Sequence, residues 1–374
     1  MLALPTLCLL TLLQPVQPPA AAPPAAPAPP AATHPQATPP TATTPPNAED
    51  PLPDFSRASV IERLRFEASR VLPLARCADT QRFLLATSFL DFPGDRTIWQ
   101  HKAKGLALTP GEYDGLAKED REGFTERAIT ETDYFYTRYG SPLAYARPLQ
   151  IACQAAGGEG SLQGKRILDF GYGGIGHLRL LAMLGAHAVG VDVDPVLRAI
   201  YAWPGDTGPV PGATFFDRQM PEGSVALVTG RFPAEPAAVA AVGTGFDLIL
   251  SKNTLKNGYI NPAQPVDKRM LVDLGVPSDV FVKELAARLN TGGYLLIYNL
   301  SPAPNPEKYI PWADGRCPFP REMLEAAGLE VVTFDANDDA AARELGRALM
   351  WDRGEHPMDL EKDLFALYTL CRKK

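Results

Sequence analysis

An acidic and glycine-rich run in the middle of the sequence carries the residue types that could do chemistry. It reads KRILDFGYGGIGHLRLLAMLGAHAVGVDVDP. A short apolar stretch ends on Asp169, the glycines Gly171, Gly173 and Gly176 open a helical pattern, and a second apolar stretch ends on Asp192. Glycines let a ligand approach the backbone, the next helix offers unpaired N–H groups, and an acid after the second strand can accept ribose hydroxyls. The order strand, turn, helix, strand, acid predicts a βαβ unit that holds a nucleotide-like ligand.

The elements that must position this unit alternate along the rest of the chain. Strand patterns fall at 225–228, 246–251, 294–299, 329–334 and 364–371. Helical patterns fall at 195–203, 233–242, 280–289, 320–328 and 337–350. This alternation predicts an α/β fold with a doubly wound, mostly parallel sheet and helices on both faces, over residues 156–374.

The first 54 residues have a different composition. Residues 1–13 are apolar and have the length of a secretory-signal core, although the first basic residue is Arg57. Residues 14–54 are nearly all Pro, Ala, Thr and Gln, which bury too little apolar surface to offset the entropy of ordering. We therefore expect an export signal or membrane anchor and a disordered tether, with a periplasmic or membrane-tethered location favoured over the cytoplasm. A mis-assigned start and a low-complexity leader stay open.

Residues 55–155 are expected to form a mainly helical extension or lid. An amphipathic pattern predicts a helix over 60–72 with Ser59 near its start. Aromatic and basic side chains then crowd the run ETDYFYTRYGSPLAYARPLQI before the glycine turn. One interpretation is a wall over the substrate, and the other is a helix that packs on the sheet. The candidate substrate residues on the first interpretation are Tyr136, Arg138, Tyr139 and Tyr145.

Charge and cysteine content narrow the function further. The net charge of −7, without a clustered basic stripe, argues against nucleic acid as a partner. The five cysteines make no C-x-x-C pair and no cluster with zinc spacing, so we expect no metal. Buried free thiols are favoured, and two disulfides among the four cysteines past the leader stay open if the protein is exported.

From about Tyr139 onward, the sequence resembles the class I S-adenosylmethionine-dependent methyltransferases. ILDFGYGGIG is similar to the first motif of that family, and VGVDVDP is similar to the segment with its ribose-binding acid. Later segments resemble its strands four to seven in order: FDLILS, RLNTGGYLLIYN, LEAAGLEVV and LYTLCRKK. The resemblance implies S-adenosyl-L-methionine as the cofactor and a seven-stranded sheet in the order 3-2-1-4-5-7-6.

The resemblance also implies roles for single residues. Asp169 would contact the amino group of the methionine moiety, the glycine turn would carry that moiety, and Asp192 would take the ribose hydroxyls. Gly230-Arg231 stands where many members have an acid that faces adenine, so adenine recognition departs from the pattern. Ser251 would border the methyl group. The expected cofactor-binding set is Asp169, Gly171, Gly173, Gly176, Asp192, Gly230, Arg231 and Ser251.

Methyl transfer from a sulfonium is an in-line displacement that needs no protein nucleophile, so positioning supplies most of the acceleration. A hydroxyl acceptor adds the need for a base. The candidates are Lys252, Asn253 and His177. The alternative for Lys252 and Asn253 is a polar start to the insertion at 252–276, and the alternative for His177, which is favoured, is a solvated residue in the first helical turn. We expect a small-molecule acceptor, whose identity the sequence does not reveal.

Two other functions compete with methyl transfer. A catalytically silent binding protein of the cell envelope would fit the export-like N-terminus, because the methyl donor is made in the cytosol. An NAD(P)-dependent oxidoreductase would fit the spacing of Gly171, Gly173, Gly176 and Asp192. The oxidoreductase hypothesis leaves Asp169 and the Thr-Gly-Gly turn at 291–293 unexplained.

Overall fold

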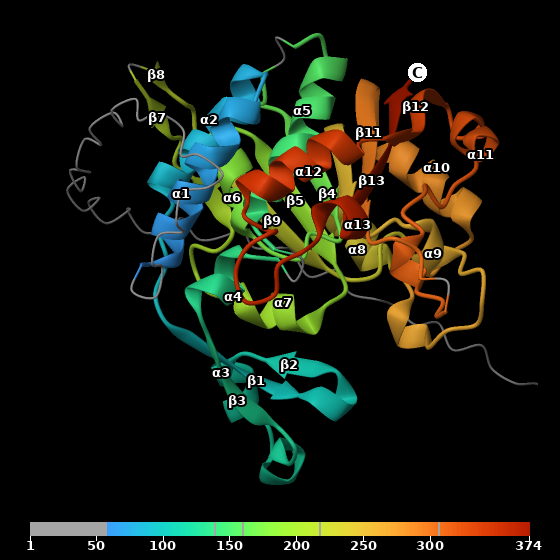
Figure 1. Ribbon diagram of the computed structural model, residues 1–374. Coiled ribbons are helices and arrows are strands. Elements are labelled where there is room, and N and C mark those ends of the chain that lie inside the picture. Colours follow the sequence, from blue (N-terminus) through green and yellow to red (C-terminus); the bar gives the residue numbers. More distant parts are fainter. Residues whose placement is uncertain (1–57, 138–139, 159–160, 217, 306) are drawn as a thin grey trace, which may run out of the picture. The chain divides into compact units, whose positions relative to one another are not determined.

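The computed structural model describes residues 58–374, apart from 138–139, 159–160, 217 and 306 (Figure 1). The chain divides into two units, Met1–Pro39 and Pro40–Lys374, and every element below belongs to the second. The predicted signal or anchor (1–13) and tether (14–54) lie outside the described residues, as do Arg138 and Tyr139. None of the helices in the described ranges is both long and apolar enough to cross a membrane.

A mixed sheet of eight strands forms the centre of the second unit (Figure 1). Its strands lie in the order β12-β13-β11-β10-β4-β5-β9-β6. The five central strands, from β11 to β9 in this order, run parallel to one another. In contrast, β13 is antiparallel to β11 and β12, and β6 is antiparallel to β9. The strands are β4 (Arg166–Phe170), β5 (His187–Asp192), β6 (Gly208–Val210), β9 (Gly223–Thr229), β10 (Phe246–Lys252), β11 (Leu289–Ser301), β12 (Leu329–Asn337) and β13 (Phe365–Lys373).

The sheet confirms the predicted α/β class, but it has one strand more than the seven expected. Residues 208–210 lie in a Gly/Pro-rich stretch without strand periodicity, and they pair with the edge of β9. A further hairpin, β7 (Thr214–Phe215) with β8 (Arg218–Gln219), was not predicted either.

Helices cover both faces of the sheet. Successive residues of a strand point to opposite faces, and Ile167 and Leu168 of β4 accordingly belong to two separate apolar cores. The first core includes residues of α1 (Val60–Val71), α2 (Ala78–Leu85), α5 (Ala146–Ala155), α6 (Gly176–Met183), α7 (Pro195–Ile200) and α12 (Asp339–Ala348). The second includes residues of α8 (Pro236–Val242), α10 (Ser278–Arg288) and α11 (Arg321–Ala326).

The helix predicted over 60–72 is confirmed as α1. Ser59 accepts a hydrogen bond from the backbone N–H of Glu62, and the Glu62 side chain accepts one from the backbone of Ser59. This reciprocal capping box satisfies two N–H groups that the first helical turn would otherwise leave unpaired.

The prediction of a mainly helical extension over 55–155 is wrong for residues 96–129. There, β1 (Arg96–His101), β2 (Leu106–Leu108) and β3 (Thr125–Ile129) form an antiparallel sheet with the short helix α3 (Pro110–Asp114) between β2 and β3. Alternate residues of β1 are buried, but two of them, Arg96 and Gln100, are polar. The alternation of apolar and polar residues that indicates a strand is therefore absent from the sequence.

A buried ion pair joins this small sheet to the main body. The Arg96 guanidinium lies 2.6 Å from an Asp206 carboxylate oxygen, with side-chain exposures of 2% and 0%. Asp206 also accepts a hydrogen bond of 2.9 Å from the hydroxyl of Tyr134 in α4 (Glu131–Phe135). Two buried charges are tolerated only with such close pairing and additional hydrogen bonds.

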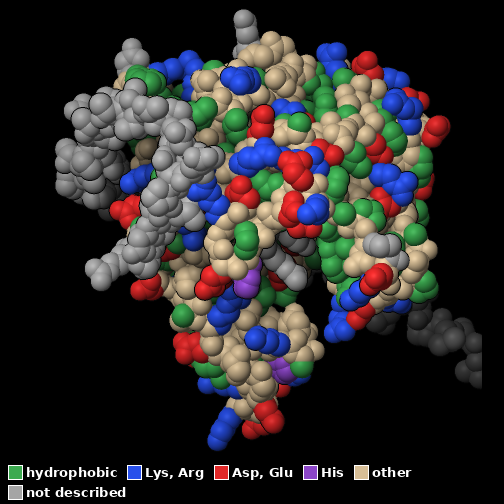
Figure 2. Space-filling view, viewed as in Figure 1, with side chains coloured by type: hydrophobic (Ala, Val, Ile, Leu, Met, Phe, Trp, Pro, Cys, Tyr) green, Lys and Arg blue, Asp and Glu red, His purple; other side chains and the backbone are tan. Residues whose placement is uncertain are grey.

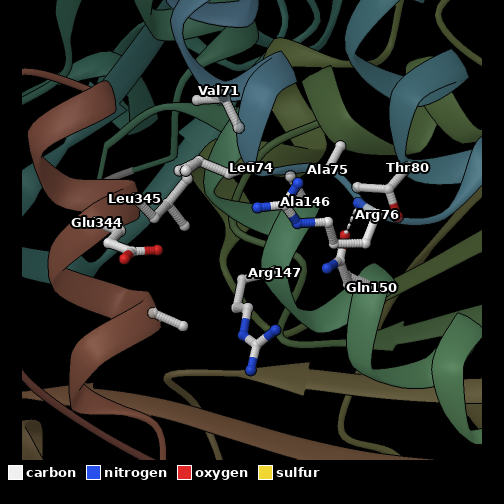
Figure 3. Close-up of a pocket in the computed structure, with 11 residues that line it drawn as sticks. Val71, Leu74, Ala75, Arg76, Thr80, Ala146, Arg147, Gln150, Glu344 and Leu345 are labelled. Atoms are coloured by element: carbon white, nitrogen blue, oxygen red, sulfur yellow. Dashed lines mark hydrogen bonds between the residues drawn. The ribbon is translucent and has the colours of Figure 1, made fainter.

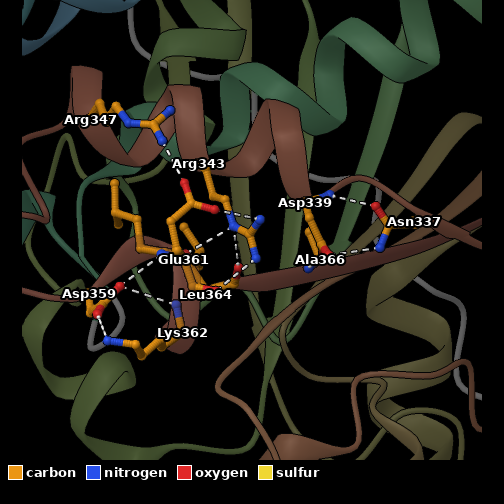
Figure 4. Close-up of polar contacts among 10 residues, drawn as sticks. Asn337, Asp339, Arg343, Arg347, Asp359, Glu361, Lys362, Leu364 and Ala366 are labelled. Atoms are coloured by element: carbon orange, nitrogen blue, oxygen red, sulfur yellow. Dashed lines mark hydrogen bonds and ion pairs between the residues drawn. The ribbon is translucent and has the colours of Figure 1, made fainter.

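The C-terminal helices are held by hydrogen bonds to backbone groups (Figure 4). Arg343 of α12 donates to the carbonyls of Leu360 and Leu364, at 3.0 and 3.2 Å, and so holds α13 (Leu360–Asp363) against α12. Asp339 accepts a hydrogen bond of 2.7 Å from the N–H of Ala366 in β13. These contacts fix α12 to the sheet.

We predict that Asp206→Asn lowers the free energy of unfolding by about 3–5 kcal/mol, because it leaves the Arg96 charge buried without a counter-charge. Urea denaturation followed by circular dichroism measures this change. Asp267→Asn, in an ion pair whose Arg269 side chain is 90% exposed, is the matched control and should change nothing measurable. Equal effects of both substitutions would contradict the structural role of the buried pair.

Candidate functional site

The predicted cofactor residues lie at the carboxyl ends of neighbouring strands. Asp169 is near the end of β4, Asp192 ends β5, Gly230 follows β9, and Ser251 is near the end of β10. The chain leaves β4 towards β5 and β9, and then crosses to β10 on the other side of β4. Ligands of open α/β sheets bind at such a reversal of strand order. The structure therefore brings these residues together at the edge where a ligand is expected.

Asp169 is the centre of a fully buried polar network. One oxygen of its carboxylate, Oδ2, accepts hydrogen bonds of 2.7 Å from the Tyr145 hydroxyl and from Nε2 of His177. The Tyr145 and His177 rings stack at a centroid distance of 3.6 Å. The other oxygen, Oδ1, is buried and has no hydrogen-bond partner among the described residues. A buried acceptor without a partner is rare in folded proteins and needs an explanation. Because this oxygen has no accessible surface, the donor of a ligand would reach it only after the segments that cover it move.

The expectation of a solvated His177 is wrong, because its side chain has no exposed surface. It lies in the first turn of α6 and points inward, beneath Tyr145 and against Asp169. Burial and the Asp169 carboxylate raise the pKa of Tyr145 well above its usual value of 10.0, so this phenol stays protonated and donates. Sequence reasoning missed the network because Tyr145 and Asp169 are far apart in the chain.

Two of the glycines are required by packing inside the protein. Gly171 has a φ of +76°, and a Cβ there would lie 2.2 Å from the Thr254 hydroxyl oxygen. A Cβ on Gly176 would lie 2.4 Å from the carbonyl oxygen of Phe135. At Gly173, with a φ of +58°, the nearest atom is a Thr137 carbon at 3.8 Å, so that position has room. A Cβ on Gly174 would lie 3.1 Å from the carbonyl oxygen of Tyr136, so the turn is closely packed except at Gly173.

Asp192 lies over this turn. Its carboxylate accepts hydrogen bonds from the backbone N–H of Gly173 at 3.3 Å and of Asp194 at 3.0 Å. Burial raises the pKa of Asp192, while these N–H groups act in the opposite direction. The carboxylate is therefore fixed beside Gly173, the position of the turn that has room.

Of the two residues predicted to bind the cofactor after β9, Gly230 lies next to the expected site and Arg231 does not. Gly230 donates its N–H to the carbonyl of Asp192 at 3.0 Å, next to the expected ribose site. Arg231 turns away and forms an exposed ion pair of 3.1 Å with Asp273. An acid that sequence reasoning missed, Glu235, places a carboxylate oxygen 2.9 Å from the position that a Cβ on Gly230 would take. The sequence did not reveal it because Glu235 lies six residues after the end of β9, at the start of α8.

Ser251 and Asn253 are occupied by contacts within the protein. The hydroxyl oxygen of Ser251 accepts from the N–H of Leu255 at 3.3 Å, which closes the turn after β10. Asn253 has a φ of +65°, and its side-chain oxygen accepts from the N–H of Leu300 at 2.7 Å. Both side chains fix the loop that follows β10.

Lys252 faces the Asp169 network. Its Nζ lies 5.3 Å from the centroid of the Tyr145 ring, and the residue is 7% exposed. Burial lowers the pKa of Lys252 to about 8, although Asp169 acts to raise it. Burial and the neighbouring Lys252 lower the pKa of Lys256 to about 7. Both lysines thus have a pKa suited to proton transfer near neutral pH. Lys256 donates to the carbonyls of Leu300 and Trp312, whereas Lys252 is the one that lies over the Tyr145 ring.

The aromatic segment before the glycine turn packs largely inside the protein. Tyr134, Phe135 and Tyr145 are buried. The Tyr136 hydroxyl donates to Glu67 at 2.8 Å and accepts from Arg63 at 3.0 Å. The packing interpretation therefore holds for these four residues, and a lid over the substrate remains a prediction.

Figure 2 shows a hollow in the surface between the small sheet and the part of the chain with α9 (Asn257–Ile260).

No group of three or more His, Cys, Asp or Glu side chains in the described ranges could hold a metal ion. Cys77, Cys153, Cys317 and Cys371 are free thiols.

Comparisons with known proteins give structural likenesses only. No family model and no curated protein matches the sequence. A magnesium protoporphyrin IX methyltransferase from Synechocystis, solved with bound S-adenosylmethionine, is 12% identical, with coverage of 60% of this chain and 76% of that one, and a TM-score of 0.29. A 1,6-didemethyltoxoflavin-N1-methyltransferase from Burkholderia thailandensis is 16% identical, with coverage of 62% and 78% and a TM-score of 0.34.

The 4+2 cyclase SpnF is also similar, at 15% identity, 61% and 80% coverage and a TM-score of 0.35. TM-scores this low do not decide the fold or the reaction. Those conclusions rest on the strand order and the residues of this chain.

We predict that the wild-type protein becomes more stable than the Lys252→Met variant as the pH rises. The unfolded chain holds the Lys252 proton up to about its usual pKa of 10.5, and the folded chain releases it at about 8. Between these values the unfolded state binds more protons, so stability increases with pH. The free energy of unfolding of the wild type, relative to that of Lys252→Met, should increase by about 2–3 kcal/mol from pH 7 to pH 10.

Urea unfolding at both pH values measures this difference. Lys362→Met is the control. Asp359 raises the pKa of Lys362, so the difference in stability between the wild type and this variant should not rise between pH 7 and pH 10. A flat difference for Lys252→Met as well would show that Lys252 is not desolvated.

Proposed function

We propose that this protein is an S-adenosylmethionine-dependent methyltransferase that acts on a small-molecule acceptor. The observation that carries the proposal is the free Oδ1 oxygen of Asp169, buried beside a glycine turn at the strand-order reversal. In this proposal β9, β5, β4, β10, β11, β13 and β12 are the strands of the order 3-2-1-4-5-7-6, and β6 is an addition at the edge.

The residues present fit this cofactor. Asp169 Oδ1 would accept from its α-amino group, and Asp192 would accept from the ribose hydroxyls after release of the Gly173 N–H. Glu235 would accept a hydrogen bond from the amino group of adenine, because its carboxylate lies near Gly230 while Arg231 is paired with Asp273. When bound, the cofactor supplies an electrophilic methyl group on a sulfonium. The chain has to hold the acceptor in line with it and exclude water.

Lys252 would be the base. Of the three candidates from the sequence, His177 is paired with Asp169 and Asn253 uses its side-chain oxygen to hold Leu300, whereas Lys252 is buried with a pKa of about 8. At pH 8 about half of such amines are neutral and can accept a proton from an acceptor hydroxyl or ammonium group. Asp169 lies near enough to stabilise the resulting ammonium ion.

Calorimetric titration of the full chain with S-adenosylhomocysteine and with NADH tests the proposal. We predict saturable binding of S-adenosylhomocysteine at one site and no binding of NADH. Binding of NADH alone would favour an oxidoreductase, and binding of neither would favour a catalytically silent protein of this fold. Each of these two results would overturn the proposal.

We also predict that Asp192→Ala weakens S-adenosylhomocysteine binding by about 1–3 kcal/mol, the range of charge-assisted hydrogen bonds. Asp194→Asn is the matched control. It removes a charge from the same loop, but an asparagine still caps α7, where Asp194 accepts from the N–H of Val196. Equal affinities of the two variants would show that the ribose does not lie on Asp192.

A further inference from the structure

Two cysteines from different helices bring their thiols together on the face of the sheet that α2 and α5 cover. Cys77 is the residue before α2, and Cys153 lies in the last turn of α5. Although they are far apart in the sequence, the two thiols are in hydrogen-bonding contact. Two cysteines whose side chains point apart cannot be bridged without movement of the backbone. These two side chains point toward each other, which is the starting geometry for a disulfide.

Hydrogen bonds on both sides of Cys77 hold it against α5. The N–H of Arg76 donates to the side-chain oxygen of Gln150 at 2.7 Å (Figure 3). Gln150 and Cys153 are three residues apart in α5, so they lie on the same side of that helix. On the other side of Cys77, the Asp79 carboxylate accepts a hydrogen bond of 2.6 Å from a backbone N–H of the loop after α5. The contact between the thiols is thus fixed by the backbone around it.

Helix capping does not account for a cysteine at position 77. The residue before a helix is commonly Ser, Thr, Asp or Asn, whose side-chain oxygen accepts from the first N–H groups of the helix. The Cys77 side chain makes no such bond to α2. It is only 4% exposed, and its thiol is turned into the protein, toward Cys153.

The two thiols differ in their access to solvent. Cys153 is partly exposed and lies in the wall of a cavity of about 260 Å³, whereas Cys77 is buried. A reagent in solution therefore reaches Cys153 first. Burial, and next the Cys77 thiol, raise the pKa of Cys153 to about 12, so a pH above neutrality favours its reactive thiolate form. A disulfide carries no charge, so burial does not disfavour the product as it disfavours the thiolate.

Cys317 and Cys371 provide an internal comparison. Both are buried in the apolar core on the opposite face of the sheet. The Cys317 thiol donates to the carbonyl of Phe319 at 3.5 Å. Because neither thiol is open to solvent, we expect both to stay reduced.

We infer that Cys77 and Cys153 are a redox-modification site, at which a small-molecule disulfide converts two thiols into a cross-link between α2 and α5. The Cys153 thiolate attacks the small disulfide, forms a mixed disulfide with one half and releases the other half as a thiolate. The Cys77 thiolate then attacks the Cys153 sulfur and releases the second half.

The two protons lost by Cys77 and Cys153 end on the two released thiols, and the two electrons reduce the small disulfide. Neither cysteine is a proposed cofactor residue, so the cross-link forms whether or not the chain transfers methyl groups.

Incubation of the reduced full chain with oxidised glutathione at pH 8.5 tests the inference. Free thiols are then blocked by alkylation, and the linked residues are identified by mass spectrometry of a digest prepared without reductant. We expect one linked pair of peptides, which contains Cys77 and Cys153, to accumulate in most of the protein. Dithiothreitol should remove this link, and Cys317 and Cys371 should be found alkylated only when the protein is denatured.

Single substitutions separate the roles of the two thiols. In Cys77→Ala, Cys153 should keep glutathione as a lasting mixed disulfide, because no second thiol attacks it. In Cys153→Ser, which changes a partly exposed side chain, Cys77 should stay free because it is buried. Cys317→Ala is the matched control, since it removes a buried thiol outside the pair, and its cross-link should form at the wild-type rate. Circular dichroism verifies that each variant is folded.

Three results would overturn the inference. They are a wild type that keeps Cys77 and Cys153 free, a link from either of them to another cysteine, and glutathione on Cys77 of the Cys153→Ser variant.

Discussion

The buried carboxylate of Asp169 is the interaction on which the rest of the site depends. A carboxylate without exposed surface is stable only when its oxygens receive hydrogen bonds. Tyr145 and His177 provide two of them to the same oxygen, and their stacked rings exclude water from it. The network joins three elements: the turn before α5, the end of β4 and the start of α6. The free Oδ1 oxygen is thereby held in one position, which is what recognition of a ligand requires.

The segments around this network serve mainly to keep it closed. Phe135 at the end of α4 packs so closely on Gly176 that no side chain fits there, and Thr254 does the same at Gly171. Burial of Lys252 gives an amine whose pKa is lowered to about 8. Packing and chemistry are therefore linked, because looser packing would let water reach the amine and return its pKa towards the usual value of a lysine.

Much of the main sheet could be predicted from the sequence, because its strands are apolar runs separated by helical periodicity. The glycine turn and the acids after β4 and β5 could be predicted for the same reason. The small sheet could not, since Arg96 and Gln100 occupy buried positions of β1. Roles that depend on contacts between distant parts of the chain also escaped prediction: the bond of Tyr145 to Asp169 and the use of Asn253 to hold Leu300. The burial of His177 and the approach of Glu235 to Gly230 were missed because the sequence does not show where a side chain points. Residues 1–57 lie outside the described part of the chain, so their proposed role in export remains a prediction.

We propose that the glycine turn holds an adenosyl amino acid at Gly173, between Asp169 and Asp192. A crystal structure of the full chain with S-adenosylhomocysteine tests this proposal most directly. We expect the α-amino nitrogen of the ligand about 2.7–3.2 Å from Asp169 Oδ1, with the ribose hydroxyls on Asp192. A ligand bound elsewhere, or an Asp169 whose Oδ1 stays unpaired in the complex, would contradict it.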